Sequence, residues 1–530
     1  MGDRLDVRAS LIVIVILSAG AASADCTAPP NLQHFYSESW GIDSHNTRFQ
    51  PQSDISRANV TALELEWVFA LGESMSPHSY PVVSDDTVFI GTPSGMLYAL
   101  DRDTGCLRWS FDAESNIRSG VVQGRSPEGR VLLYFGTASG HAYAVDAATG
   151  DSVWRTDVKD HPFALVTGTP HYADGQLFVA LSSWEVGVAM VPFYGCCTFR
   201  GSIVALNADD GTLQWRTHVI PDEPQVTGRH FIFVEKWGPS GAPVWSSPTI
   251  DAERGLVYVG TGENYSRPAS ATSDAIIAID RNNGDIRWVQ QYTELDAFNL
   301  ACVLPSHPNC PENPGPDLDF GAPPIVARTE AGEAILLAGQ KSGGVYGIDP
   351  DTGERLWEVT IGRGGYLGGV HWGMAVNERL GLLFAPISDI AAGPTGDVAP
   401  APGLYALDIA TGAARWSQPI DDNCANRELC AVGLSAALMA TDDLVFAGAL
   451  DGMLYAYDAA SGEVLWRYDT WRDFESVNGL TTQGGAIDVH GPMIAGDMLF
   501  IQSGYGSFGQ RGGNALLAFK LATTTDFSDD

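Results

Sequence analysis

Residues 96–109 read MLYALDRDTGCLRW, and the pattern of this stretch returns along the chain. A short strand of mainly apolar residues precedes Asp101, Gly105 suits a turn that needs positive φ, and a second strand ends on Trp109. The stretch therefore predicts a β-hairpin. Seven copies keep Asp or Asn, then Gly four positions later and Trp eight positions later: Asp101/Gly105/Trp109, Asp146/Gly150/Trp154, Asn207/Gly211/Trp215, Asp280/Gly284/Trp288, Asp349/Gly353/Trp357, Asp408/Gly412/Trp416 and Asp458/Gly462/Trp466.

Most copies follow another short apolar strand, such as residues 87–90, so each unit supplies about four strands, which is one propeller blade. An eighth unit has strands at 498–502 and 514–519 but no Trp after them. Residues 63–69 (LELEWVF) alternate correctly and carry the unpaired Trp67. We therefore predict an all-β, eight-bladed β-propeller in which this N-terminal strand completes the last blade and leaves no long free sheet edge.

The N-terminus carries the pattern of a secretory signal peptide. A short apolar run at 9–22 follows Arg4 and Arg8 and leads to Ala22-Ser23-Ala24. This predicts a signal peptide at 1–24 and a single propeller domain at 25–530. The run is too short to span a bilayer, and Asp25 before Cys26 argues against a lipid anchor. We expect a periplasmic or secreted protein with no membrane anchor.

Charge and cysteine content narrow the partners and the compartment. Lys and Arg number 30 and Asp and Glu 64, and the net charge of −34 would repel nucleic acid and anionic membranes. Eight cysteines in an exported chain predict disulfides. The proposed pairs are Cys302–Cys310, Cys424–Cys430 and Cys26–Cys106, whereas the adjacent Cys196 and Cys197 form either a vicinal disulfide or bonds to distant partners.

Four insertions between the repeats must form loops on the rims of the propeller, where function is most often found. They are residues 184–200, 221–244, 292–316 and 387–401. Because the first three fall in consecutive blades, we expect them to crowd one face.

The exported eight-bladed repeat resembles the quinoprotein alcohol dehydrogenases. The segments CCTFRGS (196–202), VWSSPT (244–249), GTGENYS (260–266) and DLDFGA (317–322) are most similar to the polyvinyl-alcohol dehydrogenase branch. The resemblance implies an enzyme that oxidises alcohol groups, with a polymeric alcohol such as polyvinyl alcohol as one candidate substrate. It also implies pyrroloquinoline quinone (PQQ) and Ca²⁺ or a lanthanide as cofactors. The sequence has no C-x-x-C-H haem motif, so the resemblance also implies a separate soluble c-type cytochrome as electron acceptor.

The family holds its metal with Glu, Asn and Asp side chains, and hard oxygen ligands suit Ca²⁺ or a lanthanide. Glu185 and Asn264 match the first two positions, although Glu263 is the alternative to Asn264. Asp317 matches the catalytic base and a metal ligand, and Asp319 matches an additional metal carboxylate. The family's Trp before the base is absent here, so Asp296 stays the alternative base.

The resemblance also implies cofactor contacts. Trp245 matches the indole on which the flat quinone lies, and Arg118 matches the Arg that pairs with a cofactor carboxylate. Lys341 matches the basic residue that polarises a quinone carbonyl, which is also a catalytic role. Cys196 and Cys197 stand elsewhere than the family's vicinal pair but could still cover the quinone. The main alternative function is a non-catalytic propeller that serves as a scaffold or binding protein of the cell envelope.

Overall fold

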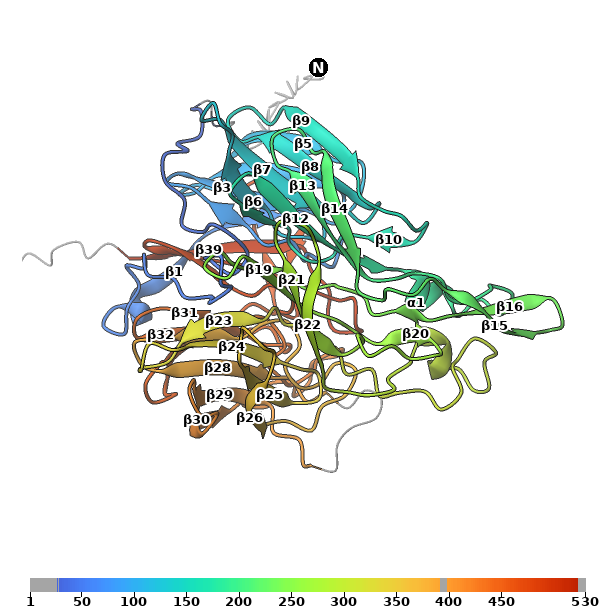
Figure 1. Ribbon diagram of the computed structural model, residues 1–530. Helices are drawn as coiled ribbons and strands as arrows, with labels where there is room; N and C mark the ends of the chain where they lie inside the picture. The colour runs from blue at the N-terminus through green and yellow to red at the C-terminus, as the bar shows by residue number, and fades with distance from the viewer. Residues whose placement is uncertain (1–25, 27, 391–397, 523–530) are drawn as a thin grey trace, which may run out of the picture.

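The computed structural model describes residue 26, residues 28–390 and residues 398–522. The signal peptide expected at 1–24 and part of the 387–401 insertion lie outside the described residues. The described chain forms eight antiparallel sheets of four or five strands, in which most neighbouring strands follow each other along the chain (Figure 1). The predicted eight-bladed propeller is confirmed.

The first four blades follow each other along the chain. They contain β2 (Val82–Val83), β3 (Thr87–Gly91), β4 (Met96–Asp101) and β5 (Leu107–Asp112); β6 (Val122–Arg125), β7 (Val131–Gly136), β8 (His141–Asp146) and β9 (Ser152–Asp157); β10 (Ala164–Leu165), β11 (His171–Ala173), β12 (Gln176–Ser183), β13 (Ser202–Asn207) and β14 (Leu213–His218); and β18 (Thr249–Asp251), β19 (Leu256–Gly260), β21 (Ala275–Asp280) and β22 (Ile286–Gln291).

The remaining blades complete the ring. They contain β23 (Ile325–Arg328), β24 (Ala334–Gly339), β25 (Gly344–Ile348) and β26 (Arg355–Thr360); β27 (Ala375–Asn377), β28 (Leu382–Ile387), β29 (Gly403–Asp408) and β30 (Ala414–Pro419); β31 (Met439–Ala440), β32 (Leu444–Gly448), β33 (Met453–Asp458) and β34 (Val464–Asp469); and β37 (Met493–Ala495), β38 (Met498–Ser503), β39 (Ala515–Leu521) and β1 (Leu63–Ala70).

The last blade joins the two ends of the described chain. Strand β1 pairs antiparallel with β39, with Leu65 opposite Phe519 and Trp67 opposite Ala518. Figure 1 shows the blue β1 beside the red β39. The predicted closure of the ring by the N-terminal strand is therefore confirmed, and it leaves β39 paired on both sides.

The repeated Gly and Trp form the seams between blades. Gly105 takes φ +69°, and a Cβ there would come within 2.7 Å of the Trp67 ring, so only glycine lets the indole lie flat on the neighbouring turn. The Trp67 Nε1 donates a hydrogen bond to the Arg102 carbonyl in the same turn. The same close approach recurs as Trp109–Gly150, Trp154–Gly211, Trp215–Gly284, Trp288–Gly353, Trp357–Gly412 and Trp416–Gly462.

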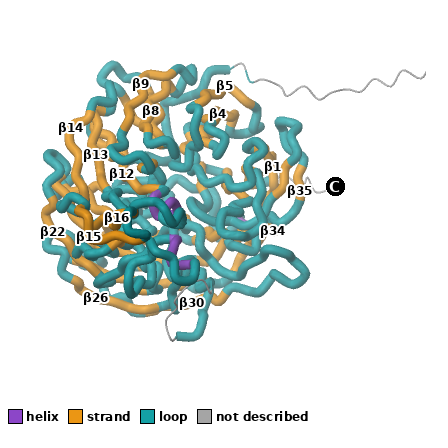
Figure 2. Tube along the Cα trace, turned by 90° about the vertical axis from the view of Figure 1, so that its right-hand side faces the viewer, coloured by secondary structure: helices purple, strands orange, loops and turns teal. Residues whose placement is uncertain are grey.

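The first three insertions meet on one face, as expected. Residues 184–200 contain α1 (Glu185–Val188), residues 221–244 contain the hairpin β15 (Gln225–His230) and β16 (Val234–Gly238), and residues 292–316 contain the short helix η2 (Leu300–Val303). The His230 ring nitrogen lies 2.8 Å from the Pro192 carbonyl, and the Asn309 amide donates to the Ala189 carbonyl. Figure 2 looks onto this face, with the helical turns near its middle.

Shorter elements complete the fold: η1 (Val60–Ala62), β17 (Ser240–Gly241) paired with β20 (Asn264–Ser266), and β35 (Asp473–Phe474) paired with β36 (Thr482–Gln483). Four disulfides join Cys26–Cys106, Cys302–Cys310, Cys424–Cys430 and Cys196–Cys197. The three spaced pairs are confirmed, and of the two options for the adjacent cysteines the vicinal bond is the one formed. None of the helices in the described part of the chain has the length and apolar character needed to cross a bilayer.

Candidate active site

A cavity of about 370 Å³ lies where residues from six blades meet. Its lining includes Arg118, Ser182, Trp245, Asp317, Lys341 and Phe508. Several of these side chains come from the segments that lead into the first strand of a blade. Arg118 precedes β6, Trp245 precedes β18 and Trp372 precedes β27, each by three or four residues. The circular arrangement of the blades therefore brings these entry segments together at the cavity.

A cluster of three carboxylates and one ammonium group occupies one wall. Oxygen atoms of Glu263, Asp317 and Asp319 all lie within 4.8 Å of one another. The Lys341 Nζ lies 2.9 Å from Asp319 Oδ2 and 3.1 Å from Asp317 Oδ1. The cluster carries more acidic groups than basic ones, and its hard oxygen atoms have the chemistry that Ca²⁺ or a lanthanide prefers.

The two aspartates of the cluster differ in their hydrogen bonds. Asp319 accepts from the Glu263 amide at 3.2 Å and from the Trp245 indole at 3.0 Å, in addition to Lys341. Asp317 stands at φ +56° with 14% of its side chain exposed, and among the described residues only Lys341 donates to its carboxylate. Asp317 therefore has an oxygen free to face a molecule in the cavity, whereas both oxygens of Asp319 are engaged.

Burial and mutual repulsion shift the acidities of this cluster. Burial, followed by the repulsion of Asp319, raises the pKa of the Glu263 carboxyl well above its usual value. Burial also raises the pKa of Asp317 well above its usual value, against the attraction of Lys341. Burial opposes ionisation of Asp319, but Lys341 and the hydrogen bonds outweigh it and lower the pKa of Asp319. A bound cation would relieve this repulsion.

The floor of the cavity is aromatic. Trp245 packs closely over Gly321, because a Cβ at this position would lie 2.0 Å from the indole Cη2 and 2.4 Å from Cζ2. The Trp372 ring meets Trp245 edge-on at 5.1 Å between centroids, and the Lys341 Nζ lies 5.5 Å from the Trp245 centroid. This gives the cavity a flat indole beside a cation, which suits a planar, electron-poor ligand.

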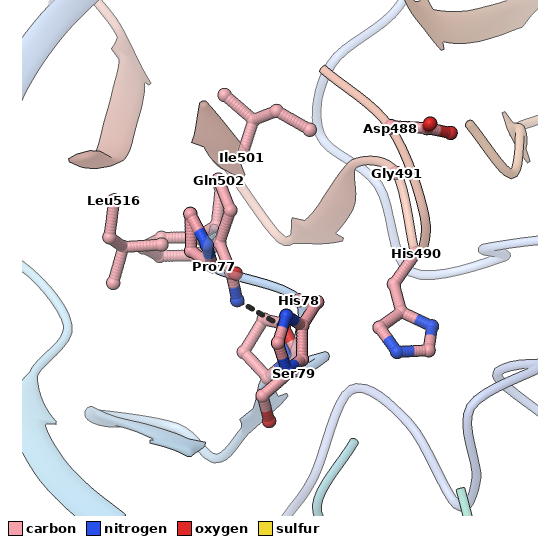
Figure 3. Close-up of a pocket in the computed structure, with 11 residues that line it drawn as sticks. Pro77, His78, Ser79, Asp488, His490, Gly491, Ile501, Gln502 and Leu516 are labelled. Carbon is pink, nitrogen blue, oxygen red and sulfur yellow. Dashed lines mark hydrogen bonds between the residues drawn. The ribbon is translucent and has the colours of Figure 1, made fainter. Parts of the chain in front are cut away.

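Arg118 adds a second positive charge to the cavity. Its guanidinium lies 5.8 Å from the Trp372 ring centroid, and no carboxylate of the described residues forms an ion pair with it. A small space has His78, Asp488 and His490 in its lining (Figure 3), and His490 also lines an adjoining space together with Arg118. Burial lowers the pKa of His78 to about 4 and that of His490 to about 3, so both rings are neutral near pH 7. Arg118 is thus available to an anionic group of a ligand.

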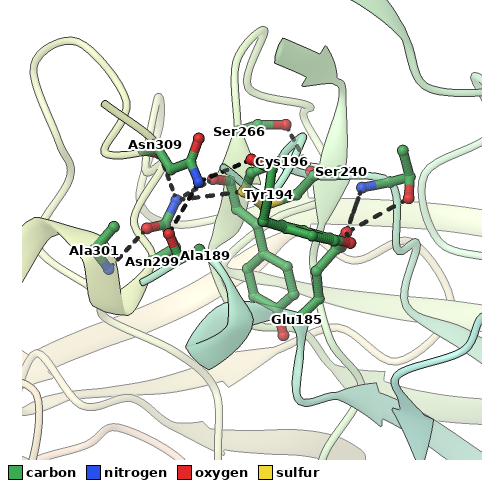
Figure 4. The surroundings of a disulfide bond; sticks show 12 residues. Glu185, Ala189, Tyr194, Cys196, Ser240, Ser266, Asn299, Ala301 and Asn309 are labelled. Atoms are coloured by element: carbon green, nitrogen blue, oxygen red, sulfur yellow. Dashed lines mark hydrogen bonds between the residues drawn. A yellow bond between two sulfur atoms is a disulfide. The ribbon is translucent and has the colours of Figure 1, made fainter. Parts of the chain in front are cut away.

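Glu185 neither lines the cavity nor belongs to the carboxylate cluster. It lies beside Tyr194 in the 184–200 loop (Figure 4). Its carboxylate accepts hydrogen bonds from the Tyr194 hydroxyl at 2.6 Å, from the Thr198 amide at 2.9 Å and from the Phe199 amide at 2.7 Å. Its neighbours Trp184 and Val186 line the cavity instead. These bonds engage both carboxylate oxygens in holding the 184–200 loop together.

Asn264 is likewise directed away from the cluster. Its amide donates to the Ser240 carbonyl at 3.0 Å, and its side-chain oxygen accepts from the Ser270 amide at 2.8 Å. Glu263, the alternative at this position, is the residue that lines the cavity. Successive side chains of an extended segment point in opposite directions, so only one of the two neighbours can face the cluster.

Two further candidates lie beside the cavity without lining it. The Cys196–Cys197 disulfide is buried among the side chains of the insertion loops, where the Asn299 amide lies 3.9 Å from Cys196 Sγ (Figure 4). Asp296 is fully buried and accepts a hydrogen bond from the Leu318 amide at 3.2 Å. Burial raises the pKa of Asp296 to about 6. Asp317 lines the cavity, whereas Asp296 does not.

The sequence reasoning missed several lining residues, among them Tyr265, Phe298, Tyr366, His371 and Trp372. A signal was available for Trp372. It precedes the first strand of its blade by three residues, much as Trp245 precedes β18 by four. An aromatic residue in such an entry segment is placed at the centre of the ring. The other residues stand in loops whose course no repeat predicts.

Comparison with known proteins gives matches over most of the chain. A family model, PQQ_2, described as outer membrane protein assembly factor BamB, matches residues 53–385 and, in an overlapping match, residues 200–525. A polyvinylalcohol dehydrogenase of Pseudomonas sp. is 37% identical over 497 residues, which cover 91% of this chain and 76% of the relative. A polyvinylalcohol dehydrogenase of Sphingopyxis sp. (strain 113P3) is 36% identical, with the same coverage of both chains.

Solved structures agree on the fold. The quinohemoprotein alcohol dehydrogenase from Comamonas testosteroni superposes with a TM-score of 0.67 at 20% identity, over 94% of this chain and 82% of that chain. The resemblance predicted from residues 196–202, 244–249, 260–266 and 317–322 is confirmed by the 36–37% sequence identity with the two polyvinylalcohol dehydrogenases. The chain belongs to the PQQ_2 family and, within the quinoprotein alcohol dehydrogenases, to the polyvinyl alcohol dehydrogenases.

Proposed function

We propose that this protein is a PQQ- and metal-dependent dehydrogenase that oxidises alcohol groups, including those of a polymer such as polyvinyl alcohol. The observation that carries the proposal is the Lys341 ion pair with Asp317 and Asp319, set beside Trp245 in one cavity. The names of the two relatives at 36–37% identity supply the substrate class. When bound, PQQ supplies a two-electron acceptor and the metal supplies a Lewis acid.

The residues present fit these groups by their chemistry. Glu263, Asp317 and Asp319 would hold Ca²⁺ or a lanthanide through carboxylate oxygens. Trp245 would support the flat ring system of the quinone, and Arg118 would pair with a cofactor carboxylate. Glu263 enters this proposal in place of Glu185 and Asn264, because their side-chain oxygens are bonded elsewhere.

Asp317 would act as the base that accepts the proton of the substrate hydroxyl. It has an oxygen without a donor among the described residues, and it stands where the cavity is open. Lys341 would hold the Asp317 carboxylate in position through its 3.1 Å contact and provide positive charge beside the reacting group. Aromatic and apolar side chains, among them Trp245 and Phe298, line much of the cavity around these two groups.

We place the protein in the periplasm or outside the cell, with a soluble c-type cytochrome as electron acceptor. The predicted leader sequence and the four disulfides support export. The net charge of −34 would attract a basic partner and accelerate its association. The competing scaffold function has no need of the buried charged cluster at the centre of the ring.

Reconstitution tests the proposal directly. The purified protein would be mixed with PQQ and either CaCl₂ or LaCl₃, and alcohol-dependent dye reduction would be followed with 2,4-pentanediol and with polyvinyl alcohol. We expect reduction that requires the quinone, the metal and an alcohol together. A protein that binds neither the quinone nor the metal would contradict the proposal and favour the scaffold.

A further inference from the structure

Large apolar side chains are exposed on the three insertions that crowd one face. Ile232 at the tip of the β15–β16 hairpin is 93% exposed, and its neighbour Phe233 and the nearby Phe193 are 71% and 67% exposed. We call the surface formed by Trp184, Val191, Phe193, Ile232, Phe233 and Leu300 the apolar rim. Soluble proteins seldom leave a contiguous apolar surface of this kind without a binding role.

The apolar rim is held in a defined shape by the loops beneath it. The Phe193 ring stacks on Phe233 at 6.5 Å between centroids. The buried Asn309 amide donates to the carbonyls of both Ala189 and Val191, which fixes the loop after α1. The Cys302–Cys310 disulfide closes the segment that carries Asn309. The exposed side chains therefore stand on an ordered support.

The apolar rim continues directly from the cavity. Trp184 and Leu300 line the cavity, and 55% and 40% of their respective surfaces are also open to solvent. The loop that starts at Trp184 leads through α1 to Phe193, which contacts the hairpin. Figure 1 shows β15 and β16 projecting beyond the blades next to α1. One apolar path thus runs from the catalytic cavity to the hairpin tip.

The shape and chemistry of this path select its occupant. A globular protein partner buries about 800 Å² on a matching face, whereas the hairpin projects from the face as a ridge. The tip residues Phe231, Ile232 and Phe233 carry no charge, in a protein whose net charge is −34. An uncharged chain with an apolar carbon backbone would lie along such a ridge, because it buries the exposed side chains without desolvating a charge.

We propose that the apolar rim binds the chain of an uncharged polymeric alcohol on one side of the carbinol that is being oxidised. This inference rests on the proposed function, since it concerns the same cavity. It explains why the apolar path begins at the cavity mouth: a polymer whose reacting unit lies beside Asp317 must leave the cavity, and Trp184 and Leu300 stand at the exit. A small alcohol would fit inside and would not reach the hairpin.

The test compares polymer and small alcohol in the reconstituted holoenzyme with a dye as electron acceptor. The variant I232S/F233S removes the exposed tip, and F193S removes the adjoining ring. For both, we expect the KM for polyvinyl alcohol to rise roughly tenfold, with kcat little changed. The kinetic constants for 2,4-pentanediol should stay at wild-type values. Leu356→Ser, which removes an apolar side chain on β26 that is 55% exposed, should leave the kinetic constants for both substrates unchanged.

Calorimetric titration of polyvinyl alcohol into the same proteins separates this inference from the proposed function. If the wild type binds polyvinyl alcohol and I232S/F233S binds it more weakly, the result supports polymer binding by the apolar rim. This holds even for a preparation that oxidises no alcohol. Unchanged polymer binding and an unchanged KM in both variants would overturn the inference. It would equally be overturned if the variants slowed only the reduction of cytochrome c, because the ridge would then bind a protein.

Discussion

Lys341 and Asp319 form a buried ion pair in which Nζ lies 2.9 Å from Oδ2, with both side chains less than a tenth exposed. Asp317 shares the same ammonium group. The attraction of these carboxylates outweighs burial and raises the pKa of Lys341 above its usual value, so the ammonium form is held firmly. The pair joins the entry segment of one blade to the loop after its second strand, β24.

Replacing Lys341 by Met should destabilise the metal-free protein. The substitution leaves the Glu263, Asp317 and Asp319 carboxylates buried together without their shared cation, which should lower the free energy of unfolding by about 3–5 kcal/mol. Thermal unfolding in EDTA measures this loss, and added LaCl₃ should restore more stability to the variant than to the wild type. As a control, Lys159→Met breaks the more exposed Lys159–Asp157 pair and should cost about 1 kcal/mol or less. Equal losses in the two variants would contradict the assigned role of Lys341.

Trp67→Ala should open the seam at which the ring closes. The indole is 4% exposed and packs on Gly105 of the neighbouring blade, so the cavity left by its removal should cost about 3–5 kcal/mol. Chemical denaturation followed by fluorescence gives the difference. Trp184→Ala removes the same side chain from a site that is 55% exposed and should cost about 0.5 kcal/mol or less. The closure argument fails if both substitutions cost the same.

The repeat made the fold predictable, because one three-residue spacing specifies both a hairpin turn and the Trp that packs on the next turn. The unpaired Trp67 at one end and a blade without Trp at the other fixed the closure. The Trp of the seventh repeat, Trp466, has no glycine turn to pack on in the last blade. Its ring instead meets Phe519 edge-on, with 5.5 Å between the ring centroids.

The candidate site was only partly predictable. Resemblance located Arg118, Trp245, Asp317, Asp319 and Lys341, and all five line the cavity. It could not decide between Glu263 and Asn264, since a shift of one residue in an extended segment reverses the face to which a side chain points. Nor could it show that Glu185 is bonded to Tyr194 and to the backbone of residues 198 and 199, because that contact depends on how an insertion loop folds back.

The disulfides should differ in their contribution to stability according to the length of chain that they close. Cys26–Cys106 spans 80 residues and Cys424–Cys430 spans 6. Loop-closure entropy then predicts a loss of about 4–5 kcal/mol for the C26S/C106S variant and about 2 kcal/mol for C424S/C430S. Denaturant unfolding of the two double variants measures the difference. The reverse order would show that strain or native contacts, rather than chain entropy, dominate.

His171 should make the protein less stable in acid. Burial lowers the pKa of His171 to about 4, while the unfolded chain has an ordinary value near 6.5. The folded state therefore binds this proton only at a lower pH than the unfolded state does. The stability is fully present above about pH 6.5, and about 3 kcal/mol of it is lost as the pH falls toward 4. His171→Asn should flatten the dependence of the unfolding midpoint on pH over this range. An unchanged slope would contradict the assignment.

The most direct test of the whole account is alcohol-dependent turnover of Asp317→Asn after reconstitution with PQQ and metal, compared with the wild type and Asp296→Asn. The variant keeps the size of the side chain, so it should fold and bind the quinone while losing turnover by several orders of magnitude, because it cannot accept the hydroxyl proton. Asp296 does not line the cavity, and Asp296→Asn should retain most of the wild-type rate. Full activity in Asp317→Asn, or its loss in Asp296→Asn alone, would contradict the account.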